Sequence, residues 1–354
     1  MLNPEKIRGR GALSNPSNRF ERRDVEAVFD DLSEDEELLD SVETTYLPVE
    51  AKSILTKNDS PDLPFRYSVN PYSGCTHGCA YCYARPYHEY WGMSAGLDFE
   101  SKIMVKLAAA DLLRATLDKK SYEPDLIVMS GATDCYQPGE REFRLTRACL
   151  EVLAEYKNPV GIITKNRLVA RDIDVFREMA AWNGVSVFIS ITTLDAELSG
   201  KLEPRASRPA ARLEAVRLLA EAGVPVGVNA APMIPGLTDS ELPAIVQAAA
   251  DAGAQFMSYS LVRLPYGVKD IFEEWLNLHA PGHAAKVMNR IREVHGESWN
   301  GRVNERFRGQ GTYAEQVNSL FRAGMRRAGL ENRPPGLTTE HFQRPVKGQM
   351  DLFG

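Results

Sequence analysis

Residues 70–85 read NPYSGCTHGCAYCYAR and place three cysteines, Cys75, Cys79 and Cys82, within eight residues. The spacing is C-x3-C-x2-C, directly after a short β-branched segment that predicts a strand. Gly74 and Gly78 let the backbone wrap tightly, so the three thiolates can converge on one centre. Buried cysteines without a shared role seldom occur at this spacing, so the stretch predicts a metal or iron-sulfur site.

Zinc is the main competitor for this site. A structural zinc takes four ligands, usually from paired C-x2-C knuckles far apart in the sequence. Here the fourth ligand would have to be His77, His88 or Cys135. A ferredoxin-type cluster would need a fourth cysteine nearby, and none follows. Three cysteines for four irons leave one iron open to a small molecule, which turns an electron carrier into a catalyst.

The overall composition is that of a globular protein. The chain has 354 residues, 44% hydrophobic and 25% charged, which suits one large domain with appendages or two domains. No run of 18 apolar residues occurs, and residues 1–23 are polar and Arg-rich, so we expect no membrane span, secretory signal or membrane partner. Five cysteines, an odd number with three crowded together, argue against disulfides and favour a reducing cytoplasm.

The net charge of −6 is unevenly distributed. Residues 24–43 hold ten carboxylates and no Lys or Arg, whereas residues 286–347 carry 12 Lys and Arg against 6 Asp and Glu. Solvated faces account for both segments. The sharper hypothesis is a polyanion-binding surface in the C-terminal third, with an acidic mimic held nearby.

Short β-branched runs alternate with amphipathic helical windows, which predicts right-handed βαβ units and a parallel sheet. A doubly wound sheet and a partial barrel both fit this alternation. Gly223 and Gly253 are expected to end two of the helices. We divide the chain into an N-terminal extension with an acidic segment (1–60), a core (61–268), a C-terminal helical region (269–332) and a tail (333–354). The predicted strands are Arg66–Pro71, Leu126–Ser130, Val160–Thr164, Val185–Ile191, Val224–Ala230 and Gln255–Val262, and the helical windows are 104–118, 142–156, 168–182, 207–222 and 239–252.

The cysteine run with Tyr81 before its last cysteine, C-x3-C-x-aromatic-C, resembles the radical S-adenosylmethionine (SAM) superfamily. More narrowly, SGCTHGCAYCYAR, SGATDCYQPGE, ITKN, SITTLD and AAPMIPGLTD resemble the spore photoproduct lyase-like, DNA repair photolyase-like branch over about residues 60–300. The extension GRGALSNPSNRFE is similar to one subfamily of that branch. The resemblance implies an α/β fold, a partial (β/α)6 TIM-like barrel with an N-terminal extension and C-terminal helices.

The same resemblance implies the chemistry. Cys75, Cys79 and Cys82 would bind a [4Fe-4S] cluster whose fourth iron takes the amino and carboxylate groups of SAM. One electron, from a reductant such as flavodoxin or ferredoxin, would cleave SAM to methionine and a 5′-deoxyadenosyl radical that abstracts hydrogen from a substrate.

Other polar residues are predicted at the same end of the sheet, because the C-terminal ends of parallel strands form the site. By resemblance, the segment after the second strand meets the SAM ammonium, Lys165 and Ser190 meet its carboxylate, and Tyr81 lies against the adenine. Helix caps, turns or solvated loops are the alternative roles for these side chains. The full set of expected cofactor-binding residues is Tyr81, Ser130, Gly131, Thr133, Asp134, Lys165, Ser190, Thr192 and Asn229.

Cys135 is the expected catalytic residue. We place it at the mouth of the site, where a thiol could return a hydrogen atom to a product radical; a small buried hydrophobe is the alternative. Spore photoproduct lyases carry a cysteine for that task in this segment, but their position falls on Gly131 here. This departure weakens the case for thymine-dimer repair itself. Cys149, at helical spacing, is expected in the core.

Two further groups of residues each have two alternative roles. Glu203, Pro204, Arg205 and Arg208 either begin a helix or contact phosphate. Aromatic residues near the cysteines either shield the cluster or stack on unpaired bases. These aromatic residues are Tyr72, Tyr81, Tyr83, Tyr87, Tyr90 and Trp91.

These observations predict a cytoplasmic radical SAM enzyme of unknown substrate. A damaged or modified nucleic acid is the first choice, and a protein or small molecule is the alternative. The competing hypothesis is a zinc- or cluster-stabilised nucleic-acid-binding module without catalysis. The last residues, Gln349–Phe353, resemble the peptide by which bacterial polymerases and repair enzymes dock on the DNA sliding clamp; a terminal anchor on the barrel is the alternative.

Overall fold

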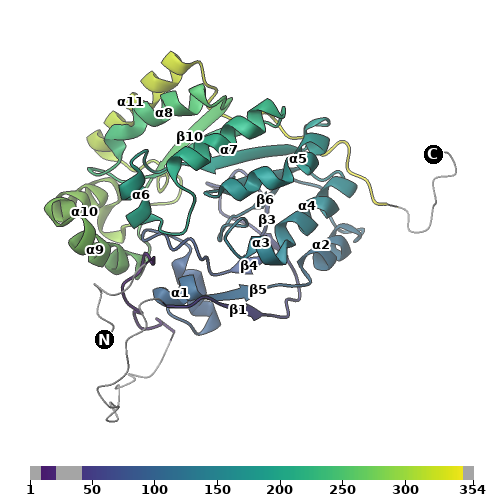
Figure 1. Ribbon diagram of the computed structural model, residues 1–354, viewed down its shortest axis with the longest axis horizontal. Helices are drawn as coiled ribbons and strands as arrows, with labels where there is room; N and C mark the ends of the chain where they lie inside the picture. The colour runs from purple at the N-terminus through teal and green to yellow at the C-terminus, as the bar shows by residue number, and fades with distance from the viewer. Residues whose placement is uncertain (1–8, 21–41, 346–354) are drawn as a thin grey trace, which may run out of the picture.

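The computed structural model describes residues 9–20 and 42–345. Its main sheet has seven strands in the order β10-β9-β8-β7-β6-β3-β2, with helices packed around it (Figure 1). All neighbouring strands from β3 to β10 are parallel, and only β2 runs antiparallel, at the edge beside β3. The strands are β2 (Leu55–Lys57), β3 (Tyr67–Val69), β6 (Ile127–Met129), β7 (Val160–Thr164), β8 (Val185–Ser190), β9 (Val226–Met233) and β10 (Phe256–Leu261).

The strand order decides between the two predicted architectures. A doubly wound sheet reverses its strand order at a switch point. Here the six parallel strands follow one another in sequence without a reversal, which is the winding of a barrel. The expectation of an α/β fold of the partial TIM-barrel type is therefore confirmed, and all six predicted strands are present.

The helices between the strands also match the predicted windows, with one correction. Residues 104 and 105, the first two of the window 104–118, are the end of the strand β5 (Lys102–Val105). It joins β1 (Thr45–Pro48) and β4 (Tyr72–Ser73) in a small second sheet, because Ile103 and Val105 pack against Tyr72 and Leu145. The helices in the predicted windows are α2 (Ala109–Leu117), α3 (Glu140–Phe143), α4 (Leu145–Glu155), α5 (Ile173–Ala180), α7 (Pro209–Glu221) and α8 (Leu242–Asp251).

Two short helices are not among the predicted windows, α1 (Leu97–Ser101) and α6 (Ala196–Leu202). The first turn of α6 is capped by Asp195, which accepts hydrogen bonds from Glu197 N and Leu198 N. Gly223 and Gly253, expected to end helices, follow α7 and α8 with φ of 76° and 89°.

Two apolar layers position the C-terminal edge of the sheet. The main core lies between the sheet and the helices that follow its strands. A second cluster joins Cys79 and Tyr81 to Trp275 and Leu276 of α9 (Val268–His279) and to α10 (Pro281–His295). The helix α11 (Gly311–Ala328) packs on α8 and places Gly324 beside Val246.

The segment between α10 and α11 reaches the far edge of the sheet. Arg306 forms an ion pair with Asp62 at 2.6 Å and donates to Ser60 Oγ at 2.6 Å, while Leu261 N donates to Phe307 O at 2.9 Å. These contacts join β10 to the loop after β2, the two ends of the seven-stranded sheet.

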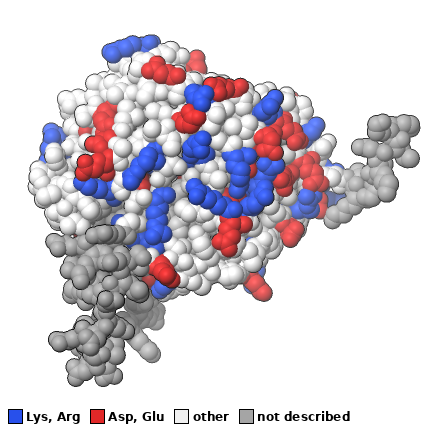
Figure 2. All heavy atoms as spheres, in the orientation of Figure 1, with Lys and Arg blue, Asp and Glu red and all other residues white. Residues whose placement is uncertain are grey.

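Residues 9–20, which we call the N-terminal strap, pack against the interior of the molecule, with Ala12 fully buried. Most of the acidic segment 24–43 and all of Gln349–Phe353 lie outside the described residues. Within the described part of the chain, no helix is long and apolar enough to cross a membrane. Lys and Arg interleave with Asp and Glu over the face in Figure 2, in keeping with ion pairs such as Arg147–Asp174 and Arg114–Glu155.

Candidate functional site

The three cysteines lie on a loop between β4 and the 3-10 helix η2 (Arg85–Trp91), above the C-terminal end of β3. Gly74 and Gly78 adopt φ of 85° and 66°, so both glycines take backbone conformations that other residues rarely adopt. A side chain at Gly78 would also meet Glu100 Oε2 at 2.4 Å. The tight wrapping expected of this loop therefore depends on both glycines.

Hydrogen bonds fix the loop to three distant parts of the chain. Cys75 N donates to Phe99 O at 2.9 Å, Ala80 N donates to Leu202 O at 3.0 Å, and Thr76 N donates to Gln137 Oε1 at 3.0 Å. The loop is thus held in place by the strand ends and helices around it.

A buried ion pair supports the loop from below. Arg85 and Glu100 pair with no exposed side-chain surface on either residue, and Arg85 Nη2 also donates to Cys79 O at 2.8 Å. The Glu100 carboxylate also accepts hydrogen bonds from the N-terminal strap, from Gly11 N to Oε2 at 3.0 Å and from Ala12 N to Oε1, the oxygen that pairs with Arg85, at 2.7 Å. Glu100 therefore joins the loop and the strap in one network.

The three cysteines fit an iron-sulfur cluster by the chemistry around them. All are free thiols, and burial raises the pKa of each one above its ordinary value. Carboxylates add to this rise, Asp134 at Cys75 and Glu203 at Cys79, whereas the charge of Arg85 at Cys82 and that of Lys165 at Cys79 and Cys82 partly offset it. Cationic groups beside buried thiols favour the thiolate form that binds iron.

The possible fourth zinc ligands are engaged or lie elsewhere. His77 is buried, with Nδ1 3.3 Å from Asp134 Oδ2 and Nε2 3.1 Å from Asn166 Nδ2. Cys135 belongs to the main core, and the ring of His88 packs edge-on against Phe99. Among the described residues, no group of three or more His, Cys, Asp and Glu side chains, the three cysteines included, is arranged to hold a metal ion. The case for a cluster rather than zinc therefore rests on the donor chemistry and spacing of the cysteines.

The predicted residues after β6 take local roles. Ser130, with φ of 72°, accepts a hydrogen bond from Cys135 N at 2.8 Å, and Thr133 Oγ1 donates to Tyr72 O at 2.7 Å. Gly131 O accepts a hydrogen bond at 2.9 Å from Tyr83, the residue that follows Cys82. This segment is therefore tied directly to the cysteine loop.

Asp134 and Lys165 come together on neighbouring strand ends. Asp134 accepts hydrogen bonds from Lys165 N at 2.8 Å and Thr164 Oγ1 at 2.7 Å. Burial opposes ionisation of Asp134, but the charge and hydrogen bond of His77, with these two bonds, lower its pKa to about 2. The Lys165 ammonium lies 5.9 Å from the centre of the Tyr81 ring.

A second buried network surrounds Glu203. This carboxylate accepts hydrogen bonds from Tyr81 and from Thr192 Oγ1, the latter at 2.8 Å, and pairs with Arg212. Burial again opposes ionisation, yet Arg212 and the charge of Lys165 lower the Glu203 pKa to about 2. Arg212 Nη1 also donates to Ser190 O at 3.0 Å, so the network reaches β8.

The remaining predicted residues lie on adjacent strands. Ser190 is opposite Asn229 in the register of β8 and β9, and Asn229 Oδ1 accepts a hydrogen bond from Ser258 Oγ at 3.0 Å. With Tyr81, Thr192 and Lys165, these residues share the C-terminal edge of the sheet.

Cys135 lies in the interior of the protein. It is fully buried, its carbonyl accepts a hydrogen bond from Thr146 Oγ1 at 2.6 Å, and it packs in the main core with Cys149 and Leu150 of α4. Its burial agrees with the alternative role of a small buried hydrophobe, and its role as a hydrogen donor stays a prediction. Cys149 is in the core, as expected.

The fold and the loop together define a class of protein: a partial-barrel α/β protein with a three-cysteine loop after the first parallel strand. The family model of the radical SAM superfamily matches residues 69–249, and the chain belongs to this superfamily. Membership implies an iron-sulfur cluster and SAM as cofactors and supports an enzyme.

Curated relatives also match much of the chain. An uncharacterized protein of Mycobacterium tuberculosis is 35% identical over 254 residues, which span 71% of this chain and 74% of the relative. An uncharacterized protein of Methanocaldococcus jannaschii is 30% identical over 200 residues, 55% of this chain and 70% of that protein.

Among solved structures, the chain is similar to spore photoproduct lyase complexed with dinucleoside spore photoproduct. The TM-score is 0.56 at 17% identity, covering 80% of this chain and 79% of that one. A mutant of the same enzyme with bound AdoMet and the dinucleoside gives a TM-score of 0.55, also at 17% identity. This likeness confirms the fold.

The sequence analysis did not single out Glu100, Arg85 or Arg212 as supports of the site. Charged residues are mostly exposed, so their presence in a sequence gives no signal of burial. Glu203 was noted in the Glu-Pro-Arg motif, but as a helix start or a phosphate contact. Its carboxylate instead faces the interior, where it contacts Tyr81 and Thr192.

Proposed function

We propose that this protein is a radical SAM enzyme that binds a [4Fe-4S] cluster through Cys75, Cys79 and Cys82 and acts on a damaged or modified nucleic acid. The observation that carries the proposal is the three-cysteine loop, in which Cys75 and Cys79 are buried and Cys82 is partly exposed, with two positive-φ glycines, at the C-terminal edge of the parallel sheet. We expect a small molecule to bind beside the loop at the C-terminal edge of the sheet, where Lys165, Ser190 and Asn229 lie.

The residues around the loop have separate roles: they bind SAM, position Tyr81 and exclude water. When bound, the cluster supplies one electron to SAM, whose cleavage gives methionine and a 5′-deoxyadenosyl radical that abstracts hydrogen. Lys165 binds the SAM carboxylate by a charge-assisted hydrogen bond, and Tyr81 is held for the adenine by Glu203 and Thr192. The apolar cluster with α9 and α10 excludes water behind Cys79.

Anaerobic reconstitution tests the cofactor assignment. We expect about four irons and four sulfides per chain. Alanine at Cys75, Cys79 or Cys82 should abolish this content, while alanine at the core residue Cys149 should retain it. One zinc and no iron would contradict the proposal and leave the non-catalytic nucleic-acid-binding module.

A second experiment tests SAM cleavage. The reconstituted protein, given dithionite and SAM, should yield 5′-deoxyadenosine. A reconstituted protein that neither binds nor cleaves SAM would contradict the enzyme hypothesis.

Two observations support nucleic acid as the substrate. The chain shares its fold with an enzyme solved with a dinucleoside photoproduct, and residues 286–347 are basic. The measurement is whether added nucleic acid raises the yield of 5′-deoxyadenosine and transfers deuterium into it from labelled bases or sugars. No change with any nucleic acid would favour a protein or small-molecule substrate.

If the substrate is DNA, a protein that recruits the enzyme to DNA is the expected partner, and we propose the sliding clamp. Gln349–Phe353 would dock on the sliding clamp, with Leu352 and Phe353 in an apolar pocket. A second proposed partner, a flavodoxin or a ferredoxin, would supply the electron for SAM cleavage. Retention of the protein on immobilised clamp, lost when Leu352 and Phe353 are both changed to Ala, tests the docking; equal retention of both proteins, or none, would exclude it.

A further inference from the structure

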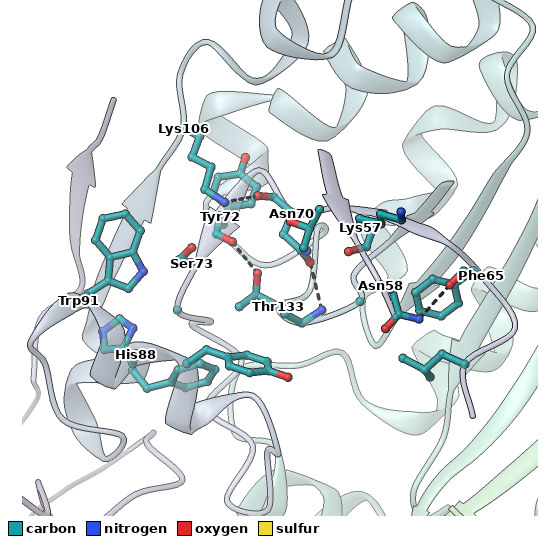
Figure 3. Close-up of a pocket in the computed structure, with 18 residues that line it drawn as sticks. Lys57, Asn58, Phe65, Asn70, Tyr72, Ser73, His88, Trp91, Lys106 and Thr133 are labelled. Atoms are coloured by element: carbon teal, nitrogen blue, oxygen red, sulfur yellow. Dashed lines mark hydrogen bonds between the residues drawn. The ribbon is translucent and has the colours of Figure 1, made fainter. Parts of the chain in front are cut away.

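A cavity of about 370 Å³ opens beside the cysteine loop, bounded by β2, the ends of β3 and β6, and η2. Figure 3 shows Trp91 and His88 on one side, Lys57, Asn58 and Phe65 on the other, and Tyr72, Asn70 and Lys106 between them. This volume lies within the range of small-molecule pockets.

The wall toward η2 is aromatic and partly open. Trp91 and Tyr87 are 43% and 51% exposed, so each presents part of its ring to solvent at the cavity. His88, 1% exposed, lines the same wall, and neither of its ring nitrogens makes a hydrogen bond of good geometry within the described residues. Partly exposed aromatic rings suit a planar ligand.

The charge of the cavity is positive. Lys57 and Lys106 line it, and no carboxylate of a described residue does. Neither lysine has an ion-pair partner within the described part of the chain; Lys106 Nζ donates to the backbone oxygen of Asn70 at 2.8 Å. Two lysines without a carboxylate are suited to a phosphate.

The cavity is separate from most of the expected SAM residues. It shares only Gly131 and Thr133 with them, whereas Lys165, Ser190 and Asn229 lie outside it. It nevertheless adjoins the cysteine loop, because Ser73 and Gly74 form part of its lining. A second ligand bound here would therefore lie next to the cysteine loop and would meet the expected SAM site only at Gly131 and Thr133.

We infer that this cavity receives one unpaired nucleotide of a single-stranded nucleic acid, with its base on Trp91 and Tyr87 and its phosphate at Lys57 and Lys106. The inference rests on the proposed function and assigns the position and form of its substrate. Base stacking on aromatic side chains requires an unpaired base, since both faces of a paired base are covered in the duplex. His88 is then placed to hydrogen-bond the edge of the base.

Equilibrium binding to the reconstituted protein tests this assignment. The probes are a fluorescently labelled DNA single strand, the RNA of the same sequence and the DNA duplex, measured by anisotropy under anaerobic conditions. We expect at least one single strand to bind more tightly than the duplex, and Trp91→Ala to weaken that binding about tenfold. Whichever strand binds identifies the source of the nucleotide.

The salt dependence of binding tests the phosphate contact. Lys57→Gln removes one phosphate contact, so the slope of log K against log salt should become shallower by about 0.7. The matched controls are Lys120→Gln and Leu320→Ala, two exposed residues that do not line the cavity, and both should bind like the wild type.

The outcomes separate this inference from the proposed function. Tighter duplex binding, or equal binding by the wild type, Trp91→Ala and Lys57→Gln, would overturn the nucleotide pocket even if the wild type cleaves SAM. A wild type that fails to cleave SAM would overturn the proposed function, whatever the binding results are.

Discussion

Arg85 and Glu100 form an ion pair beneath the cysteine loop in which neither side chain has any exposed surface. The pair is satisfied on all sides, because Arg85 donates to Cys79 O and to the carbonyls of Ala95 and Gly96, and Glu100 accepts from Gly11 N and Ala12 N. A charge buried at this depth is stable only while its partner is present.

Neutralising one member of this pair should therefore be costly. We expect Glu100→Gln to lower the free energy of unfolding by about 3–5 kcal/mol, because Arg85 is left as an uncompensated buried charge. The matched control is Glu155→Gln, whose partner Arg114 is 37% exposed and whose loss should cost less than about 1 kcal/mol. Urea denaturation measures both, and equal losses would contradict the central role of Glu100.

The positive φ of Gly78 in the cysteine loop gives a prediction about the iron content. Gly78→Ala combines a positive φ with a clash against Glu100, so the variant should retain little iron after reconstitution. Gly92 also has positive φ, 72°, but nothing lies within 4 Å of a side chain there. Gly92→Ala should therefore keep its iron while losing about 1 kcal/mol of stability. Iron analysis per folded chain decides, and full iron in Gly78→Ala would refute the argument.

The low pKa of Glu203 links the site to acid stability. Its pKa of about 2 in the folded protein lies below the ordinary value of 4.5, so ionised Glu203 stabilises the fold above about pH 4.5. That contribution is lost progressively as the pH falls from about 4.5 toward 2, and amounts to at most about 3 kcal/mol. Glu203→Gln should be less stable at pH 7 and depend less on pH in this window. Parallel pH profiles of the two proteins would exclude the linkage.

Lys165 should act on SAM rather than on the cluster. Lys165→Ala should weaken SAM binding by about 1.5–3 kcal/mol, since a hydrogen bond to a charged group is lost, and should leave the iron content unchanged. Lys201→Ala, an exposed lysine on α6 paired with Glu197, serves as the control. Isothermal titration of the reconstituted proteins with SAM measures the effect. Loss of iron in the Lys165 variant would instead indicate a structural role.

The burial of Cys135 gives a prediction about its chemistry. Because its thiol lies in the same core as that of Cys149, Cys135→Ala and Cys149→Ala should each cost about 1 kcal/mol of stability and leave SAM cleavage intact. Thermal unfolding and 5′-deoxyadenosine yield are measured on both variants. A loss of substrate turnover in Cys135→Ala alone, with unchanged SAM cleavage, would support its expected role as a hydrogen donor.

The sequence predicted the strands and the three cysteines of the site, but not the buried charged residues that hold the cysteine loop in place. The β-branched runs and helical windows located six strands, because parallel strands covered on both faces are apolar almost throughout. Strand order settled the architecture, and order depends on long-range pairing that periodicity does not contain. Met104 and Val105 were the first residues of the helical window 104–118 but belong to strand β5, because this strand pairs on both sides with β1 and β4, whose positions periodicity does not reveal.

Side-chain burial was the second limit of prediction. The motif spacing located Cys75, Cys79 and Cys82, but placing Cys135 required knowing which way the turn after β6 points. Ser130, with its positive φ, directs that turn and accepts the hydrogen bond from Cys135 N. Such a conformation is uncommon for serine, so local propensity could not foresee it.

The N-terminal strap also sets an order of events during synthesis. Its partners are made long after it: Glu89 holds Arg19, Glu100 holds Gly11 and Ala12, Arg205 holds Gly9, and Glu274 holds Ser14. The contact of Ser14 therefore forms only after residue 274 has been synthesised, and the strap that Glu100 joins to the cysteine loop is fully packed only then.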